Sequence, residues 1–353
     1  MKRIAVLGAS GSIGRQALEI IEGQPGLELV AAASGSTDID GLAPLTQVGG
    51  DLTQLLERSS PDLVLNAVVG FAGVGATLWA LERGVTLALA NKESLVAAGD
   101  LALTAQHRGG GLLLPVDSEH SAVHQCLAAC SPEQVHSVVL TASGGPFRGR
   151  SRAELEDVTV AEALAHPTWS MGPKITVDSA TLSNKALEVI EAHILFGLSY
   201  EVIDVVIHPT SVVHALVRLR DGAALAHLGY PDMRVPISYA LTYPDRAAVP
   251  VPPLDLAAGM TLEFAAPDLQ AFPLLELGRR AGELGGTYPC AFNAENEVAV
   301  AAFLERQLPF LGIADTVERV LAEHDGAPAR DLDELVEIDA AARRLAEGAV
   351  TVA

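Results

Sequence analysis

The stretch KRIAVLGASGSIG, residues 2–14, decides the fold. The apolar run from Arg3 to Leu7 predicts a buried strand, and the pattern over 12–22 predicts a helix with one apolar face. The glycines between them follow G-x-x-G-x-x-G, a variant of the dinucleotide fingerprint. Glycine allows a tight turn and close backbone approach there, and the helix N-terminus favours a pyrophosphate. Any sharp strand-to-helix turn uses glycine, but this strand–turn–helix context favours dinucleotide binding.

Four more apolar runs follow in the first third of the chain. They predict strands at 27–33, 63–69, 86–90 and 112–116, with helical stretches at 75–83 and 93–107. Unbroken apolar strands separated by helices are typical of a parallel sheet covered on both faces. The segment 37–60 is polar, contains glycine and is weakly patterned. The sequence predicts an α/β protein with an N-terminal Rossmann-like parallel sheet.

The pattern changes after about residue 117. Strand-like runs at 137–141 and 202–207 mix with long polar loops, and prolines then break up the segment 243–272. Four helical patterns follow, at 274–284, 291–306, 313–324 and 331–346, and they predict a C-terminal helical bundle. The expected domains are 1–117 for the nucleotide, 118–242 as an α+β catalytic and connective domain, 243–272 as a linker and 273–353 as the bundle.

The charge balance excludes some partners. The 353 residues include 23 basic and 44 acidic side chains, a formal charge of −21, which repels nucleic acid and anionic membranes. A phosphate-bearing substrate must therefore be bound by a local site. The apolar stretch 63–81 approaches the length of a membrane span, but its glycines favour a strand, a turn and a helix. Three cysteines, expected as buried thiols, and a chain that starts on a strand pattern favour a cytoplasmic protein.

Asp117-Ser118-Glu119-His120 follows a predicted strand, where ligands bind in open parallel sheets. Carboxylates at i and i+2 project to one side of an extended chain, and two that close together repel unless a cation compensates. Hard oxygen ligands favour Mg²⁺ or Mn²⁺. The alternative is a solvated strand end. His120 and His124 lie one helical turn apart, but no third zinc ligand is evident, which favours a hydrogen-bonding role.

The most unusual stretch is DSATLSNKALE, residues 178–188. A helical pattern puts Asn184 and Glu188 on one face, with Lys185 beside them. A serine, an amide and an ammonium together hold a phosphate dianion, and Glu188 can then reach a metal next to that anion. The alternative is a capped surface helix with an ordinary Lys–Glu pair.

Three polar segments complete the candidate site. HPTWSMG, residues 166–172, carries one of two tryptophans in a loop, which indicates a lid, or else core anchoring of the Trp. Ser143-Gly144-Gly145 follows a strand and can add a hydroxyl and backbone donors to an anion site. Asn91-Lys92-Glu93 follows another strand, where Lys92 can meet a substrate hydroxyl or merely begin a helix. The second strand ends in 34–37 without a carboxylate, which favours NADP over NAD.

Together these stretches resemble one family, the 1-deoxy-D-xylulose 5-phosphate reductoisomerases. The matching segments occur in the family's order and span most of residues 1–240. They are LGASGSIG from Leu7, NKESL from Asn91, DSEH from Asp117, ASGGPF from Ala142, HPTWSMG from His166, KITVDSATLSNKALE from Lys174, HPTSVVH from His208 and PDMRVPI from Pro231. The resemblance implies rearrangement of the sugar phosphate's carbon skeleton, then reduction by NADPH to 2-C-methyl-D-erythritol 4-phosphate.

The resemblance also implies roles for individual residues. The metal, Mg²⁺, Mn²⁺ or Co²⁺, would be bound by Asp117, Glu119 and Glu188. The substrate phosphate would be held by Ser143, Ser179, Asn184 and Lys185. The catalytic set would be Lys92, Ser118, Glu119, His166 and Trp169, of which all but Trp169 also contact substrate, as does Glu188. The residues that would line the NADPH site are Ser10, Gly11, Ser12, Ile13, Gly35, Ser36, Thr37, Asn91, Glu93, Gly172 and Met233. A homodimer is the family's expected assembly.

The chain departs from the family pattern in the nucleotide region. Ser36 and Thr37 stand where the family usually has a basic residue and Asn, and the segment from there to Ser60 is shorter than usual. This weakens the expected contact with the 2′-phosphate. Pro173 replaces a common basic residue, and Thr210 a common Gln. Two other functions remain as alternatives. A plain aldehyde or semialdehyde reductase gives no reason for three metal carboxylates beside a phosphate site, and the retention of every expected catalytic position argues against a non-catalytic nucleotide sensor.

Overall fold

The computed structural model describes residues 1–351 and divides into two compact units. The first unit combines Met1–His124 with Asp232–Leu254. The second combines Gln125–Pro231 with the chain from Asp255 onward. Each is described by itself below, and the four-part division expected from the sequence stays a prediction.

The first unit is built on a six-stranded sheet of order β3-β2-β1-β4-β5-β6, in which every pairing is parallel. The strands are β1 (Lys2–Leu7), β2 (Leu27–Ser34), β3 (Leu45–Val48), β4 (Leu63–Asn66), β5 (Thr86–Leu89) and β6 (Leu113–Pro115). The order reverses between β1 and β4, the point where doubly wound sheets bind ligands. The predicted Rossmann-like sheet is confirmed.

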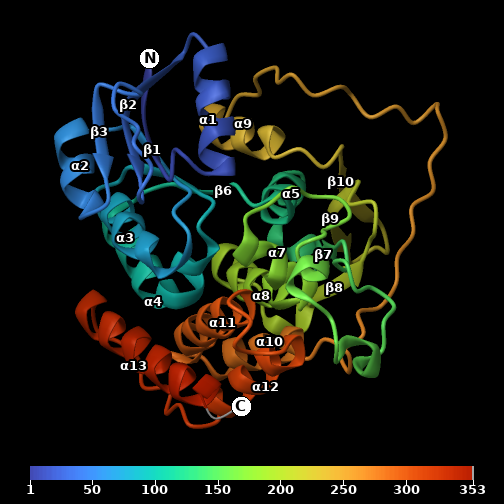
Figure 1. Ribbon diagram of the computed structural model, residues 1–353. Coiled ribbons are helices and arrows are strands. Elements are labelled where there is room, and N and C mark those ends of the chain that lie inside the picture. The colour runs from blue at the N-terminus through green and yellow to red at the C-terminus, as the bar shows by residue number, and fades with distance from the viewer. Residues whose placement is uncertain (352–353) are drawn as a thin grey trace. The chain divides into compact units, whose positions relative to one another are not determined.

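Six helices belong to this unit. They are α1 (Ser12–Gly23), α2 (Leu52–Ser59), the 3₁₀ turn η1 (Gly70–Gly73), α3 (Val74–Glu82), α4 (Lys92–Gly109) and α9 (Arg234–Thr242). α1 and α9 lie side by side, although more than 200 residues separate them in the chain (Figure 1). Lys2 Nζ donates to the Leu241 and Tyr243 carbonyl oxygens at 3.0 and 3.2 Å, which fastens the end of α9 to β1.

The weakly patterned segment 37–60 contains two elements that the sequence did not predict, β3 and α2. β3 is a four-residue edge strand with every residue at least partly exposed, so it lacks the apolar run that predicts a buried strand. α2 begins at Asp51, whose side chain accepts from the Thr53 backbone N–H at 2.9 Å, a standard helix cap.

The second unit carries a four-stranded mixed sheet of order β10-β9-β7-β8. The strands are β7 (Val135–Ala142), β8 (Ile203–Ile207), β9 (Val213–Leu219) and β10 (Ala224–Leu228). β7 pairs with β8 in parallel, and the other two pairings are antiparallel. β9 and β10 were not predicted; β10 is an edge strand in which exposed and half-buried residues alternate, and it is too short and too polar to stand out.

Helices make up the rest of this unit. The longer ones are α7 (Pro173–Ala180), α8 (Ser183–Phe196), α10 (Leu274–Leu284), α11 (Tyr288–Leu304), α12 (Phe310–Leu321) and α13 (Leu332–Thr351). The shorter ones are η2 (Pro132–Gln134), η3 (Arg152–Leu155), α6 (Val160–Ala163) and η4 (Tyr200–Val202), and α5 (Ser118–Leu127) runs into this unit from the first. The predicted C-terminal helices are confirmed, with α11 and α12 starting three residues earlier than expected.

Within residues 1–351, no helix combines the length and the apolarity needed to cross a bilayer. The apolar stretch 63–81 forms β4, η1 and most of α3, as its glycines indicated. All three cysteines are free thiols. Cys126 and Cys290 are buried as expected, but Cys130 is half-buried because it lies beyond the end of α5.

One carboxyl in the helical part lies where charge is costly. Glu295 in α11 is wholly buried, and neither of its oxygens has a hydrogen-bond partner among the described residues. Burial raises the pKa of Glu295 from 4.5 to about 9. The folded protein therefore keeps this carboxyl protonated at neutral pH, whereas the unfolded chain releases the proton near pH 4.5. Stability is lost as the pH rises between these two values.

We predict that Glu295→Met removes this loss. Between pH 6.5 and 8 the wild type should lose about 2 kcal/mol of unfolding free energy relative to the variant, since each pH unit contributes about 1.4 kcal/mol. Denaturant unfolding at several pH values measures the difference. Glu305→Met, at an exposed position after the same helix, is the control and should track the wild type. A pH-independent difference would contradict the prediction.

Candidate active site

The turn between β1 and α1 needs its glycines. Gly8 has φ 83°, and a Cβ there would lie 2.3 Å from the Ala67 carbonyl oxygen. A Cβ on Gly14 would lie 2.2 Å from the Gly8 oxygen. Gly11 precedes the first residue of α1 in an extended conformation, so the first N–H groups of the helix point into the turn. The turn fits the backbone of a pyrophosphate-binding loop.

The end of β2 offers polar groups and no carboxylate. Gly35, Ser36 and Thr37 are exposed, and the Ser34 hydroxyl donates to the Thr37 carbonyl oxygen. A cation that sequence reasoning missed lies nearby, because the Arg15 guanidinium donates to the Ser10 carbonyl oxygen. The position of Arg15 on the first turns of the predicted helix could have indicated this cation from the sequence.

Asn91 ties together the loops that follow β4 and β5. Its side-chain amide donates to the carbonyl oxygens of Val68 and Gly70 at 2.7 and 2.9 Å, and to Glu93 Oε2 at 3.1 Å. Asn91 and Glu93 are both buried, so this network is fixed by the fold. Met233, directly before α9, packs against the core of the same unit. The predicted nucleotide residues of the first unit thus lie in four places: the turn between β1 and α1, the end of β2, the end of β5 and the position directly before α9.

Asp117 and its neighbours form a polar cluster at the end of β6. Lys92 Nζ donates to Asp117 Oδ2 at 2.7 Å, and the two side chains are only 5% and 14% exposed. His120 Nδ1 lies 3.6 Å from the other Asp117 oxygen. The Ser118 hydroxyl donates to Glu119 Oε2 at 2.5 Å. The prediction of an extended chain here was wrong, because α5 begins at Ser118 and places Glu119 on its first turn.

The zinc alternative for the two histidines finds no support in the geometry. His124 Nδ1 is hydrogen-bonded to the Tyr239 hydroxyl at 2.9 Å, and burial lowers the pKa of His124. His120 faces Asp117. His124 therefore has the hydrogen-bonding role that the sequence favoured, and His120 lies beside the Asp117 carboxylate.

In the second unit, His166 joins two serines. Its Nε2 lies 3.0 Å from Ser143 Oγ and 3.1 Å from Ser179 Oγ. Its Nδ1 accepts from the backbone N–H groups of Thr168 and Trp169 at 3.2 and 2.9 Å. An acceptor nitrogen carries no proton, so the ring proton sits on Nε2. Burial lowers the pKa of His166, which keeps the ring neutral. The two hydroxyls and this N–H form a compact set of anion ligands.

The first turns of α8 carry the second part of the anion site. Asn184 Nδ2 donates to Glu188 Oε1 at 2.5 Å, and Lys185 Nζ pairs with Glu188 Oε2. Lys185 and Glu188 are 4% and 1% exposed, so the surface-helix alternative is excluded. A buried carboxylate needs this compensation, because an isolated charge in the interior is costly.

Sequence reasoning missed a polar contact beneath this site. Asp178 of α7, next to Ser179, is buried and accepts from Asn296 Nδ2 of α11 at 2.8 Å. Lys174 Nζ reaches the other Asp178 oxygen at 2.9 Å. Asn296 and Asp178 are 118 residues apart in the chain, so no local sequence pattern could predict their hydrogen bond. Through it, the C-terminal helices fix the helix that carries Ser179.

The loop 166–172, predicted as a lid, is tied to its surroundings by hydrogen bonds. Trp169 is half-buried, its backbone N–H donates to His166, and Thr168 Oγ1 donates to the Pro209 carbonyl oxygen at 3.3 Å. Gly172 directly precedes α7 in the second unit, so its assignment to the nucleotide site stays a prediction. The structure thus forms two groups: Lys92, Asp117, Ser118 and Glu119 in the first unit, and Ser143, His166, Ser179, Asn184, Lys185 and Glu188 in the second.

Comparison with protein families finds matches along most of the chain. The model described as 1-deoxy-D-xylulose 5-phosphate reductoisomerase matches residues 4–49 and 47–99. The model of its C-terminal domain matches 113–196, and a further one, described as the DXP reductoisomerase C-terminal domain, matches 228–345. These ranges include the nucleotide turn and both groups of site residues.

Curated proteins match over nearly their whole length. A 1-deoxy-D-xylulose 5-phosphate reductoisomerase from Moorella thermoacetica is 48% identical, over 99% of this chain and 98% of its own. The protein of the same name from Chloroherpeton thalassium is 44% identical, over 98% and 97%. A third, from Leifsonia xyli, is 47% identical over 98% of each chain.

Solved structures agree in fold. A 1-deoxy-D-xylulose 5-phosphate reductoisomerase from Zymomonas mobilis, in complex with NADPH, has a TM-score of 0.90 at 37% identity and covers 99% of both chains. A DOX-P reductoisomerase in complex with NADPH, fosmidomycin and magnesium has a TM-score of 0.92 at 38% identity, over 100% of this chain and 99% of its own.

We predict that Asn296→Ala weakens binding of inorganic phosphate. Removing the amide leaves a buried Asp178 oxygen without its donor, at a cost of about 1–3 kcal/mol, and loosens the helix that carries Ser179. Calorimetric phosphate titration and thermal unfolding measure the two effects. Asn293→Ala is the matched control, because Asn293 is buried in the same helix but bonds to Glu297. Both variants should unfold earlier, and equal phosphate affinities would contradict the prediction.

Proposed function

Because the chain belongs to the 1-deoxy-D-xylulose 5-phosphate reductoisomerase family, we propose how its residues carry out that family's reaction. The protein isomerises 1-deoxy-D-xylulose 5-phosphate and reduces the product with NADPH to 2-C-methyl-D-erythritol 4-phosphate, a step towards isoprenoids. The observation that carries this conclusion is 44–48% identity over 97–99% of the chain. It favours isomerisation over the plain reductase and the nucleotide sensor.

The phosphate of the substrate is proposed to lie between the two serines and α8. Ser143, Ser179 and the Nε2–H of His166 supply neutral donors, and Asn184 supplies an amide. Lys185 supplies the charge, and its present pairing with Glu188 places the ammonium on the buried side of the helix. A dianion bound here then shares Lys185 with Glu188.

The proposed metal ligands are Asp117, Glu119 and Glu188. Their oxygens are the hard ligands that Mg²⁺ and Mn²⁺ prefer, and the family's Co²⁺ is a third possible ion. The residues fit a cation, because Asp117 and Glu188 each already carry a lysine ammonium as compensating charge. When bound, a divalent ion polarises the substrate carbonyl and stabilises negative charge that develops on its oxygen.

Lys92 and Ser118 are proposed to hold the substrate's oxygen-bearing carbons. Lys92 is 4% exposed overall and fixed on Asp117, so its ammonium is oriented before substrate arrives. His166 orients the phosphate end and Trp169 covers the carbon chain. Exclusion of water by this loop strengthens each electrostatic contact and retains the aldehyde formed by rearrangement.

NADPH is proposed to bind along the nucleotide turn of the first unit and supplies the hydride for the reduction. The fit is carried by Gly8 and Gly14, whose missing Cβ atoms let the backbone approach a pyrophosphate. The remaining contacts are proposed for Ser10, Gly11, Ser12, Ile13, Gly35, Ser36, Thr37, Asn91, Glu93, Gly172 and Met233. Arg15 adds a cation beside Ser10, which compensates for the missing basic residue after Gly35.

A homodimer in the cytoplasm is proposed as the working form. The segment 255–273 exposes large apolar side chains, with Leu256 64%, Phe264 44% and Leu269 43% exposed. Exposed apolar patches of this kind mark association surfaces. β10 is the edge strand of its sheet and adds an exposed Leu228 to the same unit. Both features support association through the second unit.

We predict that the purified protein oxidises NADPH when 1-deoxy-D-xylulose 5-phosphate and Mn²⁺ are added. Absorbance of the reduced nicotinamide measures the rate, and product analysis must show 2-C-methyl-D-erythritol 4-phosphate. Chelation should abolish turnover, because the substrate carbonyl then loses its Lewis acid. Addition of Mg²⁺ should restore turnover. NADH should give a lower kcat/KM than NADPH. Oxidation that survives chelation unchanged would exclude the proposed reaction.

We predict that Glu188→Gln lowers kcat by at least about a thousandfold, through loss of one anionic metal ligand and of the charge beside Lys185. NADPH affinity, measured by nucleotide fluorescence, should stay unchanged, because the nucleotide turn lies in the other unit. Glu201→Gln, at an exposed position in the same unit, is the control and should keep full turnover. Lost NADPH binding in Glu188→Gln would contradict the assigned role.

A further inference from the structure

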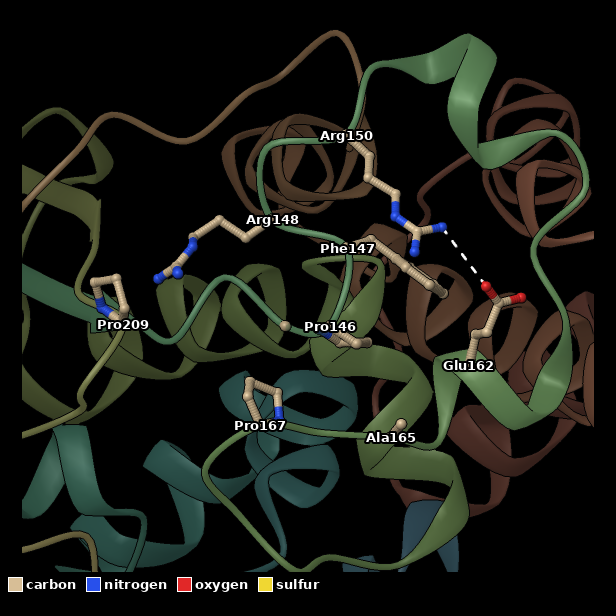
Figure 2. Close-up of a pocket in the computed structure, with 9 residues that line it drawn as sticks. Pro146, Phe147, Arg148, Arg150, Glu162, Ala165, Pro167 and Pro209 are labelled. Atoms are coloured by element: carbon tan, nitrogen blue, oxygen red, sulfur yellow. Dashed lines mark ion pairs between the residues drawn. The ribbon is translucent and has the colours of Figure 1, made fainter.

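A cavity lies in the second unit beside the turn that follows Ser143. It has a volume of about 350 Å³ and is open to solvent on one side. Its walls come from the turn after β7, the end of α6 and the loops at Pro167 and Pro209 (Figure 2). Among its lining residues are Pro146, Phe147, Arg148, Arg150, Glu162 and Pro167. None of the proposed substrate, metal or nucleotide residues lines it.

A tight turn presents two arginines to this cavity. The Arg150 N–H donates to the Phe147 carbonyl oxygen at 3.0 Å, and Gly149 has φ 83°, a conformation that favours glycine. The Arg148 stem lies against Gly144, where a Cβ would meet it at 3.1 Å. The two guanidinium groups turn to opposite ends of the cavity, Arg148 towards Pro209 and Arg150 towards Glu162 (Figure 2).

Arg148 is exposed, and its guanidinium has no acid beside it. No hydrogen bond or ion pair joins this guanidinium to another residue in the part of the chain that the structure describes. The protein carries a formal charge of −21, so an anionic ligand must be bound by a local group of cations. A guanidinium binds carboxylate and phosphate groups through two parallel N–H donors.

Arg150 keeps donors for a ligand as well. Its Nη1 lies 3.8 Å from Glu162 Oε1, which is longer than a hydrogen bond. Glu162 is held in place by the cap of α6, since its Oε2 accepts from the Thr159 N–H and hydroxyl at 2.9 and 2.8 Å. The Arg150 guanidinium lies 5.2 Å from the Phe147 ring centroid, which fixes its plane on an aromatic surface. Two arginines against one acid leave the cavity a net positive charge.

The rest of the lining is apolar. Pro146, Phe147, Ala165, Pro167 and Pro209 give rigid walls without side-chain donors or acceptors. A cavity of this volume, apolar with a few placed charges, is of the size and kind that binds small molecules. The walls select a ligand with an apolar body, and the arginines select one with an anionic group.

We propose that this cavity binds a small organic anion, a phosphate monoester or a carboxylate with a compact apolar body, whose anionic group pairs with Arg148. Its lining contains none of the four residues proposed to hold the substrate phosphate. Ala165 and Pro167 flank His166, and Gly145 lies two residues beyond Ser143, so the ligand contacts both segments that meet in the Ser143–His166 bond.

Calorimetric titration of the full-length protein with phenyl phosphate and with benzoate tests the proposal. Both should bind to the wild type, and benzyl alcohol, which lacks the charge, should not. Arg148→Met keeps the stem against Gly144 and removes the charge. It should weaken both anions at least about tenfold, the usual loss for a charge-assisted hydrogen bond.

Two matched variants separate this site from other sources of affinity. Ser179→Ala removes a donor from the substrate's phosphate site and should leave the affinity of benzoate, which carries no phosphate, unchanged. Arg280→Ala removes an exposed arginine of α10 and should also leave the benzoate affinity unchanged. A benzoate affinity that falls with Ser179→Ala and survives Arg148→Met would overturn the proposal, as would an absence of benzoate binding to the wild type at millimolar concentration.

Discussion

A carboxylate inside a protein is tolerated only beside a compensating charge, and each unit of this chain meets that constraint with a lysine. Asp117 is held by Lys92 at the end of β6, and Glu188 is held by Lys185 on α8. Both pairs are shielded from solvent, where a lone charge would be costly and a paired one is oriented. Two kinds of element place these four groups. Lys92 and Asp117 follow the ends of β5 and β6 in the parallel sheet, and the first turns of α8 carry Lys185 and Glu188.

The hydrogen bonds that position these two lysine–carboxylate pairs differ in how far along the chain they reach. In the first unit the support is local, because Asn91, directly before Lys92, donates to the Val68 and Gly70 carbonyl oxygens in the loop after the neighbouring strand β4. In the second unit it reaches across the chain, because Asn296 of α11 holds Asp178 beneath the phosphate site. The helical C-terminal part is therefore structural support for the site, although it contributes no proposed ligand.

Much of the fold was predictable because buried parallel strands and amphipathic helices leave clear periodic patterns. The β1–turn–α1 unit and the four C-terminal helices were found in this way. β3 and β10 escaped because short edge strands with half-exposed residues carry no such pattern. Among site residues, Lys185 and Glu188 were identifiable from spacing within one helix. Asn296 was not, because only tertiary folding brings it to its partner Asp178.

The tautomer of His166 has a consequence for proton balance. Two backbone N–H groups hold Nδ1 as an acceptor, and burial disfavours the imidazolium, so the ring stays uncharged around neutral pH. The anion site then contains one formal cation, Lys185, and several neutral dipoles. A phosphate monoester, with its second ionisation near pH 6, enters such a site as the dianion without drawing a proton from the histidine. Capture of the substrate is thus insulated from small changes in the acidity of its surroundings, and the histidine acts as a fixed dipole.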